Sequence, residues 1–178
     1  MVIRTARLDL IAATAEHLRA EDNPQLLGEL LQAEVPEGWP PGSYDRDAID
    51  FFLAKAIEGG EAVIGWYAWY AVRRPVAGER ASLVAAVGYF GPPSGDGTVE
   101  IGYSVVPSAR NQGYATEAAE ALTRRALALP GVERVTAEAH DTNVSSIRAL
   151  LRCGFRRTGP GREEGHSRYE RRRFNSTG

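Results

Sequence analysis

Apolar positions in the first half of the chain change from a strand period to a helix period and back again. Residues 4–12 alternate apolar and polar side chains, which predicts an opening strand with Leu8 and Leu10 on one face. Helical spacing then predicts helices that begin at Thr14, at Pro24 and at Ser43 or Asp45. Segments 61–72 and 83–90 read as strands, and the glycine and proline turns around them indicate an antiparallel meander.

The stretch from Glu100 to Leu129 reads as a strand, a turn and a helix. Another strand is expected at 132–140, and because a helix joins it to the strand at Glu100, the two strands should run parallel. A helix at 143–152 and strands at 155–159 and 166–174 complete the chain. The order β-α-α-α-β-β-β-α-β-α-β-β predicts an α+β fold, with one mixed sheet and helices on both faces.

The turn into the central helix is suited to an anion. It carries Arg110 and reaches the helix at Gly113, where no side chain covers the free backbone N–H groups of the first turn. A phosphate would fit against these groups.

Two motifs carry a resemblance to a known family. The segment Arg110-Asn111-Gln112-Gly113-Tyr114-Ala115 resembles the Arg/Gln-x-x-Gly-x-Gly/Ala signature with which GNAT superfamily N-acetyltransferases hold the pyrophosphate of coenzyme A. Asn143-Val144-Ser145-Ser146, followed by Cys153-Gly154-Phe155, resembles that family's Asn-x-x-Ser…Gly-Phe segment. The match covers roughly 83–155 and hardly extends into the first eighty residues. It is nearest to the branch of ribosomal-protein N-terminal acetyltransferases.

The resemblance implies a single acetyltransferase domain over 1–178, with an acetyl-CoA-binding core at 83–155 and a substrate side at 1–60. It also implies that the parallel strands splay apart beyond Tyr103 and that the backbone of Val105 and Val106 bonds the pantetheine arm. The residues expected around the pyrophosphate are Arg110, Asn111, Gln112, Gly113, Tyr114 and Ala115. Asn143 and Ser146 would hold the cofactor arm or an ordered water, although their simpler role is to cap a helix.

Acetyl transfer to an amine needs a base and a group that stabilises the departing thiolate. Glu100 is the candidate base, and its alternative is a strand-edge carboxylate that is solvated or paired with an arginine. Many relatives carry a tyrosine as the acid where this chain has Leu150. Ser146 is therefore assigned a catalytic role, with Tyr103, Tyr114 or water as alternatives.

Three further positions are weighed against simpler roles. His140 is either a second base or a loop-edge histidine, and Cys153 is expected to be a small buried apolar residue. The arginines of the last two strands and the turn between them, Arg162 among them, are expected to form a mostly solvated face.

Substrate contacts are expected at 34–44, which includes a proline-rich loop, and in the strand after Glu61. Trp39 and Tyr44, flanked by Glu34 and Glu37, would form an aromatic and acidic lip for a cationic amine. In the alternative interpretation, Trp39 only packs the loop onto the core.

Composition limits the classes of partner that the protein is expected to bind. A net charge of −2 and a pI near 6.0 give no basic footprint for nucleic acid. No apolar run reaches membrane-spanning length, the start lacks a secretory pattern, and a single cysteine fits a reducing cytoplasm, so a cytoplasmic protein without membrane partners is expected. The histidines lack metal-ligand spacing, and a homodimer is left open.

The sequence thus predicts an acetyl-CoA-dependent N-acetyltransferase. The acetyl group would pass directly, in a ternary complex, to a primary amine of a protein N-terminus or a small molecule. Two alternatives remain at this point: an acyl-CoA-binding regulatory module without turnover, and an interaction protein that binds no cofactor.

Overall fold

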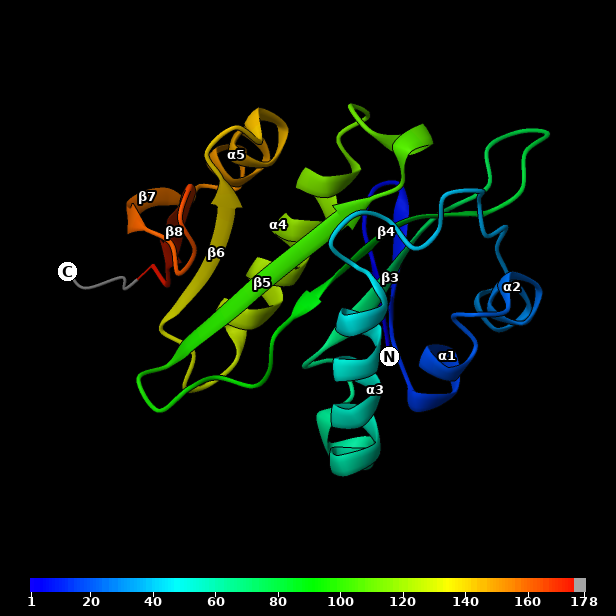
Figure 1. The fold of residues 1–178 in the computed structure, drawn as a ribbon, viewed down its shortest axis with the longest axis horizontal. Coiled ribbons are helices and arrows are strands. Elements are labelled where there is room, and N and C mark those ends of the chain that lie inside the picture. The colour runs from blue at the N-terminus through cyan, green and yellow to red at the C-terminus, as the bar shows by residue number, and fades with distance from the viewer. Residues whose placement is uncertain (175–178) are drawn as a thin grey trace.

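The computed structural model describes residues 1–174, which build one mixed sheet with helices on both faces (Figure 1). The order of strands in the sheet is β1-β2-β3-β4-β5-β6-β8-β7. The strands are β1 (Val2–Arg4), β2 (Leu8–Ala12), β3 (Ala68–Arg73), β4 (Ser82–Tyr89), β5 (Thr98–Val105), β6 (Arg134–His140), β7 (Arg156–Pro160) and β8 (His166–Arg172). The helices are α1 (Ala15–Arg19), α2 (Pro24–Leu31), α3 (Arg46–Gly59), α4 (Tyr114–Ala128) and α5 (Val144–Arg152), with short 3-10 turns η1 (Gly60–Val63) and η2 (Pro107–Ala109).

The sheet opens between β5 and β6, its one parallel pair. Strands β1 to β5 form an antiparallel meander, and β5 then pairs with β6 only where Thr98 to Glu100 face Arg134 to Thr136. Beyond Glu100 the two strands diverge, which Figure 1 shows as a V that opens toward α5. The expected α+β fold with a splayed parallel pair is confirmed. The separation begins after Glu100, three residues before the expected point, which was Tyr103.

Each face of the sheet has its own apolar core. Alternate side chains of β5, Val99 and Ile101, are buried together with Leu122 on the side of α4. The opposite face is covered by α1, α2 and α3, where Leu27, Phe52 and Tyr70 belong to a second cluster of buried side chains. Because side chains alternate along a strand, Glu100, Gly102 and Ser104 must point to the α3 side.

Local signals place the first three helices as expected. Thr14 caps α1 by accepting the backbone N–H of His17, and Asn23 caps α2, in which Pro24 occupies the first turn. Of the two caps considered for α3, Asp45 is the one found, and its carboxylate accepts the N–H of Ala48. Leu27 and Leu31 of α2 are buried, whereas Leu26 is 43% exposed.

Two predicted strands are wrong in their extent. The predicted strand 4–12 is interrupted: β1 ends at Arg4 and β2 begins at Leu8. The chain turns at Thr5, whose N–H and hydroxyl both donate to the Leu8 carbonyl, and β2 then pairs back on β1. The segment 61–72 starts as the 3-10 turn η1, and only its second half belongs to β3. In both cases β-forming side chains extend through a turn that local pattern alone does not reveal.

Candidate active site

The turn before α4 forms a cradle of backbone N–H groups. Gly113 has a left-handed backbone with φ of 83°, and no side chain caps the helix. The first helical hydrogen bond runs from the Glu117 N–H to the Gly113 carbonyl, at 3.0 Å. Within residues 1–174, the N–H groups of Tyr114, Ala115 and Thr116 have no hydrogen-bond acceptor. These donors and the helix dipole suit a diphosphate, so the chain fits the nucleotide end of coenzyme A.

Arg7, from the β1–β2 turn, holds this cradle and was not predicted from the sequence. Its Nη1 donates to the Gln112 carbonyl at 2.9 Å, and its Nε donates to the Glu117 carboxylate at 2.8 Å. The guanidinium lies 4.5 Å from the centroid of the Tyr114 ring. A Cβ built on Gly113 would approach Arg7 Nη2 to 3.3 Å, so a side chain has little room there. No pattern within the motif points to a residue more than one hundred positions away.

The other predicted cradle residues have distinct environments. Arg110 is exposed and donates to the Val105 carbonyl at 3.2 Å, and Gln112 donates to the Ser108 carbonyl at 3.1 Å. Asn111 is exposed with a left-handed φ of 61°, which helps to turn the loop toward the helix. Tyr114 is buried beneath Arg7, whereas Ala115 is partly exposed. Tyr114 belongs to the core and is therefore withdrawn as a candidate acid.

The free edge of β5 presents different residues from those expected. The N–H of Val106 donates to the Val84 carbonyl at 3.0 Å, and its carbonyl accepts from Ala109 at 3.0 Å. Both polar groups of Val106 are thus engaged, and the expectation that it bonds the pantetheine arm is corrected. Because polar groups alternate along an antiparallel strand, those of Tyr103 and Val105 face the gap toward β6. That the backbone groups of Tyr103 face the gap could have been found only from the strand register.

The gap is bridged at its open end by two hydroxyl groups. The Tyr103 hydroxyl lies 3.0 Å from Ser146 Oγ and also donates to the Ser146 carbonyl at 3.1 Å. Asn143 caps α5, because its side-chain oxygen accepts the Ser146 N–H at 3.1 Å. Burial raises the pKa of Tyr103 to about 12, against the opposing hydrogen bond with Ser146. Tyr103 is therefore a neutral O–H donor at ordinary pH.

Glu100 lies where β5 leaves β6, and its side chain is 20% exposed. Its carboxylate accepts a hydrogen bond from Arg162, which precedes β8 in the β7–β8 turn. The Arg162 Nε is also 3.4 Å from a carboxylate oxygen of Glu138, and Arg168 donates to Glu138 at 3.1 Å. The pairing with an arginine that was weighed for Glu100 is present. Arg162 therefore does more than form a solvated face, although its side chain remains 61% exposed.

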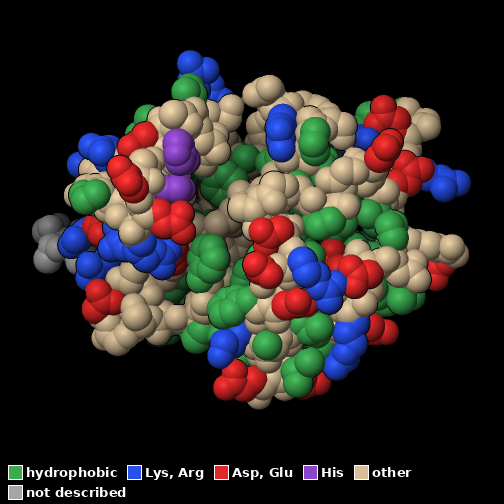
Figure 2. Space-filling model, viewed as in Figure 1, with side chains coloured by type: hydrophobic (Ala, Val, Ile, Leu, Met, Phe, Trp, Pro, Cys, Tyr) green, Lys and Arg blue, Asp and Glu red, His purple; other side chains and the backbone are tan. Residues whose placement is uncertain are grey.

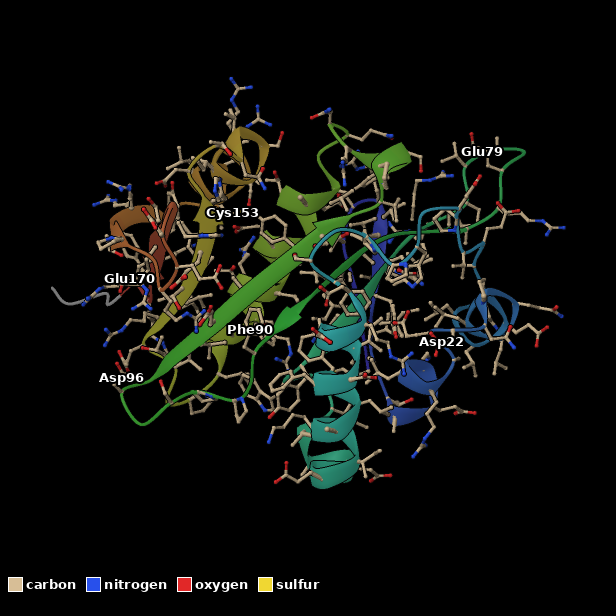
Figure 3. The ribbon with its side chains drawn as sticks, in the orientation of Figure 1. Asp22, Glu79, Phe90, Asp96, Cys153 and Glu170 are labelled. Carbon is tan, nitrogen blue, oxygen red and sulfur yellow. The ribbon has the colours of Figure 1, made fainter. Side chains whose placement is uncertain are left out.

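The two remaining reactive candidates differ in exposure. His140 is exposed, accepts the Thr142 N–H at 3.2 Å and meets the His166 ring edge-on, with centroids 5.0 Å apart. Cys153, at the end of α5 in Figure 3, is buried as predicted. Burial, with help from the charge of Glu120, raises the pKa of its thiol to about 11. Cys153 is thus not a thiolate nucleophile at neutral pH.

Trp39 and Tyr44 converge on Glu21, a buried carboxylate that the sequence did not single out. Trp39 Nε1 donates to one oxygen of Glu21 at 2.6 Å, and the hydroxyls of Tyr44 and Tyr70 donate to the other at 2.6 Å each. Burial raises the pKa of both tyrosines well above the ordinary value. This supports the interpretation that Trp39 packs the loop onto the core. The acidic partner is Glu21, whereas the predicted Glu34 faces solvent beside Arg80.

Comparisons with known proteins agree with this geometry. Residues 14–156 match the family model described as "Acetyltransferase (GNAT) domain". The chain is 30% identical over 125 residues to "Uncharacterized N-acetyltransferase YjdG" of Bacillus subtilis (strain 168), covering 70% of this chain and 71% of that protein.

Solved structures that share the fold include two ribosomal-protein acetyltransferases. Ribosomal-protein-S5-alanine acetyltransferase from Vibrio fischeri matches with a TM-score of 0.69 at 13% identity, over 100% of both chains. RimL, a ribosomal L7/L12 alpha-N-protein acetyltransferase solved in complex with coenzyme A, matches with a TM-score of 0.64 at 17% identity, over 97% of this chain and 98% of that chain. Among residues 1–174, no helix is long and apolar enough to cross a membrane. The chain belongs to the GNAT family of acetyltransferases, and it catalyses acyl transfer that depends on acetyl-CoA.

Proposed function

We propose that this enzyme transfers the acetyl group directly to a primary amine in a ternary complex. The acceptor is a protein or peptide N-terminus or a small-molecule amine. Acetyl-CoA supplies the acetyl group as a thioester, held by the core at 83–155 of a single domain, and residues 1–60 form the acceptor side. The observation that carries this proposal is the position of Glu100, at the fork of the parallel strands and on the α3 side.

Glu100 is the base in this proposal. An amine attacks only when neutral, and an α-amine with a reference pKa near 8 loses its proton far more readily than a lysine near 10.4. The Glu100 carboxylate takes that proton directly or through a water. Arg162 orients the carboxylate and is itself held by Glu138.

The edge of β5 would bind the donor and polarise its carbonyl. The N–H and carbonyl groups of Tyr103 and the N–H of Val105 face the gap, where an extended arm can pair with them as an added strand would. The Val105 carbonyl already accepts a hydrogen bond from Arg110. A backbone N–H from this edge stabilises the negative charge that develops on the thioester oxygen. Asn143 fixes the start of α5 on the other side of the gap.

The hydroxyls of Ser146 and Tyr103 would stabilise the departing thiolate. Because a thiol has a reference pKa near 8.5 and burial raises the pKa of Tyr103 to about 12, Tyr103 keeps its proton. To bond the thiolate, its O–H would turn away from the Ser146 carbonyl. Ser146, bonded to Tyr103 at 3.0 Å, gives the pair a second donor. Together they take the place of the tyrosine that is absent at Leu150.

Direct transfer is supported by the state of the side chains that could form an acyl-enzyme. The thiol of Cys153, the single cysteine, is buried and donates to the Thr116 carbonyl at 3.4 Å. In the described part of the chain, the side chain of Ser146 contacts Tyr103 and no histidine or carboxylate that could activate it. An acyl-enzyme would need one of these groups as an activated nucleophile.

Initial-rate kinetics test this proposal. Thiol release is measured over a matrix of acetyl-CoA and amine concentrations, with peptides, amino acid amides and polyamines as acceptors. We expect release that depends on the amine, with double-reciprocal lines that intersect. Parallel lines would instead indicate an acyl-enzyme, and release without any amine dependence would overturn the proposal.

A further inference from the structure

A small pocket lies on the α3 face of the sheet, beside Glu100. Its walls include Tyr44, Ala48 and Phe52 from the acceptor side, and Phe90 and Gly102 from the sheet. Phe90 lies between β5 and α3 (Figure 3) and remains 51% exposed. Figure 2 shows hydrophobic side chains exposed on this face, next to a lobe rich in charged and histidine side chains.

The pocket lies on the same side of β5 as Glu100, the proposed base. Glu100 and Gly102 are two residues apart on β5, so they point to the same side about 7 Å from each other. Gly102 leaves the floor of the pocket open, because a Cβ there would come within 3.0 Å of the Phe90 ring. Ser104, one step further, meets Ser43 of the loop before α3, with 3.0 Å between their hydroxyl oxygens. This contact closes the far end of the pocket. The two hydroxyls there are hydrogen-bonded to each other.

Size and chemistry limit what the pocket can hold. Its volume is about 80 Å³, roughly half that of the apolar cavity of about 150 Å³ that takes up benzene. A group of about one to four carbon atoms fits inside, and an aromatic ring is too large to be enclosed. The walls are mostly aromatic and aliphatic and bring no charged side chain into the pocket, so a charged group would lose its hydration without a partner there.

We propose that this pocket receives the substituent on the carbon next to the reacting amine. The acceptor is then a primary amine with a small uncharged aliphatic group at that carbon, as in a peptide or amino acid amide that begins with alanine or valine. Phe90 and Ala48 are the residues that set the size limit. This inference rests on the proposed amine acetylation, since it places the amine within reach of Glu100.

The test compares amides and tripeptides of glycine, alanine, valine and phenylalanine as acceptors, by thiol release at saturating acetyl-CoA. We expect kcat/KM for alanine and valine to exceed that for phenylalanine by about tenfold or more, because the ring cannot enter. If the amides and the tripeptides show the same preference for small side chains, an amino acid amide is sufficient as the acceptor. If only the tripeptides are acetylated, the acceptor is a peptide. Equal use of valine and phenylalanine would overturn the size limit.

Two variants change the pocket in opposite directions. Phe90→Ala removes an exposed ring and should raise kcat/KM for phenylalanine relative to alanine by about tenfold. Ala48→Leu fills the pocket and should lower kcat/KM for valine about tenfold while glycine is spared. Neither should change the KM for acetyl-CoA, because both residues lie on the α3 side. Phe51→Ala is the matched control, since Phe51 is 42% exposed, neighbours Phe52 and does not line the pocket.

The outcomes separate the two proposals. If thiol is released with amines but both pocket variants shift all acceptors equally, the pocket does not select the acceptor and this inference fails alone. If no amine in any series promotes thiol release, the proposed amine acetylation fails, and the inference that rests on it fails with it.

Discussion

The two faces of the sheet are built for different tasks with different chemical groups. On the α4 side, the donor site consists mainly of backbone N–H groups at Gly113 and along the free edge of β5. On the α3 side, side chains define the site: Glu100, the aromatic pocket walls, and Glu21 with its three donors. Backbone geometry can serve one invariant ligand, whereas side chains must differ where the acceptor differs. The α4 side, which carries the recognisable motifs, therefore gives the least information about the acceptor.

The first prediction removes the base from the α3 side and leaves the donor site intact. Glu100→Gln should lower kcat by about 10²-fold to 10⁴-fold, the usual range for a general base, with little change in acetyl-CoA affinity. Steady-state thiol release and calorimetric titration with coenzyme A measure the two quantities. Glu138→Gln is the matched control, since Glu138 binds the same Arg162. An equal loss in both variants would mean that the ion network matters and the base does not.

The second prediction concerns Tyr103, which lies on β5 at the gap toward β6, with its side chain packed on the α4 side. Its pKa is raised to about 12 in the folded state, so the unfolded chain loses this proton first, near pH 10. Its contribution to stability is complete below pH 10 and is lost as the pH rises toward 12, by up to about 3 kcal/mol. Urea unfolding between pH 9 and 12 should show a smaller loss for Tyr103→Phe than for the wild type. The same pH dependence in both would refute the burial of this hydroxyl.

The third prediction tests whether side chains hold the acceptor loop. Glu21→Gln replaces one acceptor oxygen with a donor that faces groups which themselves donate, and we expect the free energy of unfolding to fall by about 2 kcal/mol. Denaturant unfolding measures this change. Asp22→Asn, next along the chain with a side chain 75% exposed, should change it by less than about 1 kcal/mol. Similar values for the two variants would show that the buried carboxylate does not anchor the loop.

A fourth test concerns access to the backbone cradle. Gly113→Ala should weaken acetyl-CoA binding about tenfold, because the new Cβ crowds Arg7 and the converging N–H groups. Gly131→Ala controls for backbone strain, since Gly131 has a similar φ of 80° with no atom near the site of its Cβ. Calorimetric titration should show the loss for Gly113→Ala alone. Unchanged affinity in that variant would argue against a diphosphate at this turn.

The fifth and smallest effect is expected at Arg7. Arg7→Met frees the Gln112 carbonyl and removes the guanidinium from Glu117, which keeps its bonds to the Thr5 hydroxyl and to the backbone N–H of residue 7. We expect the KM for acetyl-CoA to rise about fivefold while kcat is nearly unchanged. Arg4→Met serves as the control, because among residues 1–174 the Arg4 side chain pairs with Asp9 alone, at the surface. A fall in kcat without a change in KM would assign Arg7 to another step.

Prediction from the sequence was accurate where the signal is local. The helix start at Thr14 and the entry into the central helix at Gly113 are set by a few neighbouring residues, and both were predicted correctly. Of the two caps considered for α3, Ser43 and Asp45, the structure has Asp45. The errors arise where a distant contact decides. The turn at Thr5 exists because β1 folds back on β2, and Val106 is unavailable to the donor because Val84 takes its N–H.

The sequence by itself determined the alternation of elements, the mixed sheet and the glycine turn that offers N–H groups to an anion, because these depend on side-chain period and backbone freedom within short stretches. Only the tertiary structure brought Arg7 to that turn, Arg162 to Glu100, and Glu21 to three donors from separate segments. Such partners lie far apart along the chain. A buried polar group must find a hydrogen-bond partner, and the packing of the fold decides which residue that partner is. The pocket that we propose for the acceptor is therefore formed only when α3 packs on the sheet.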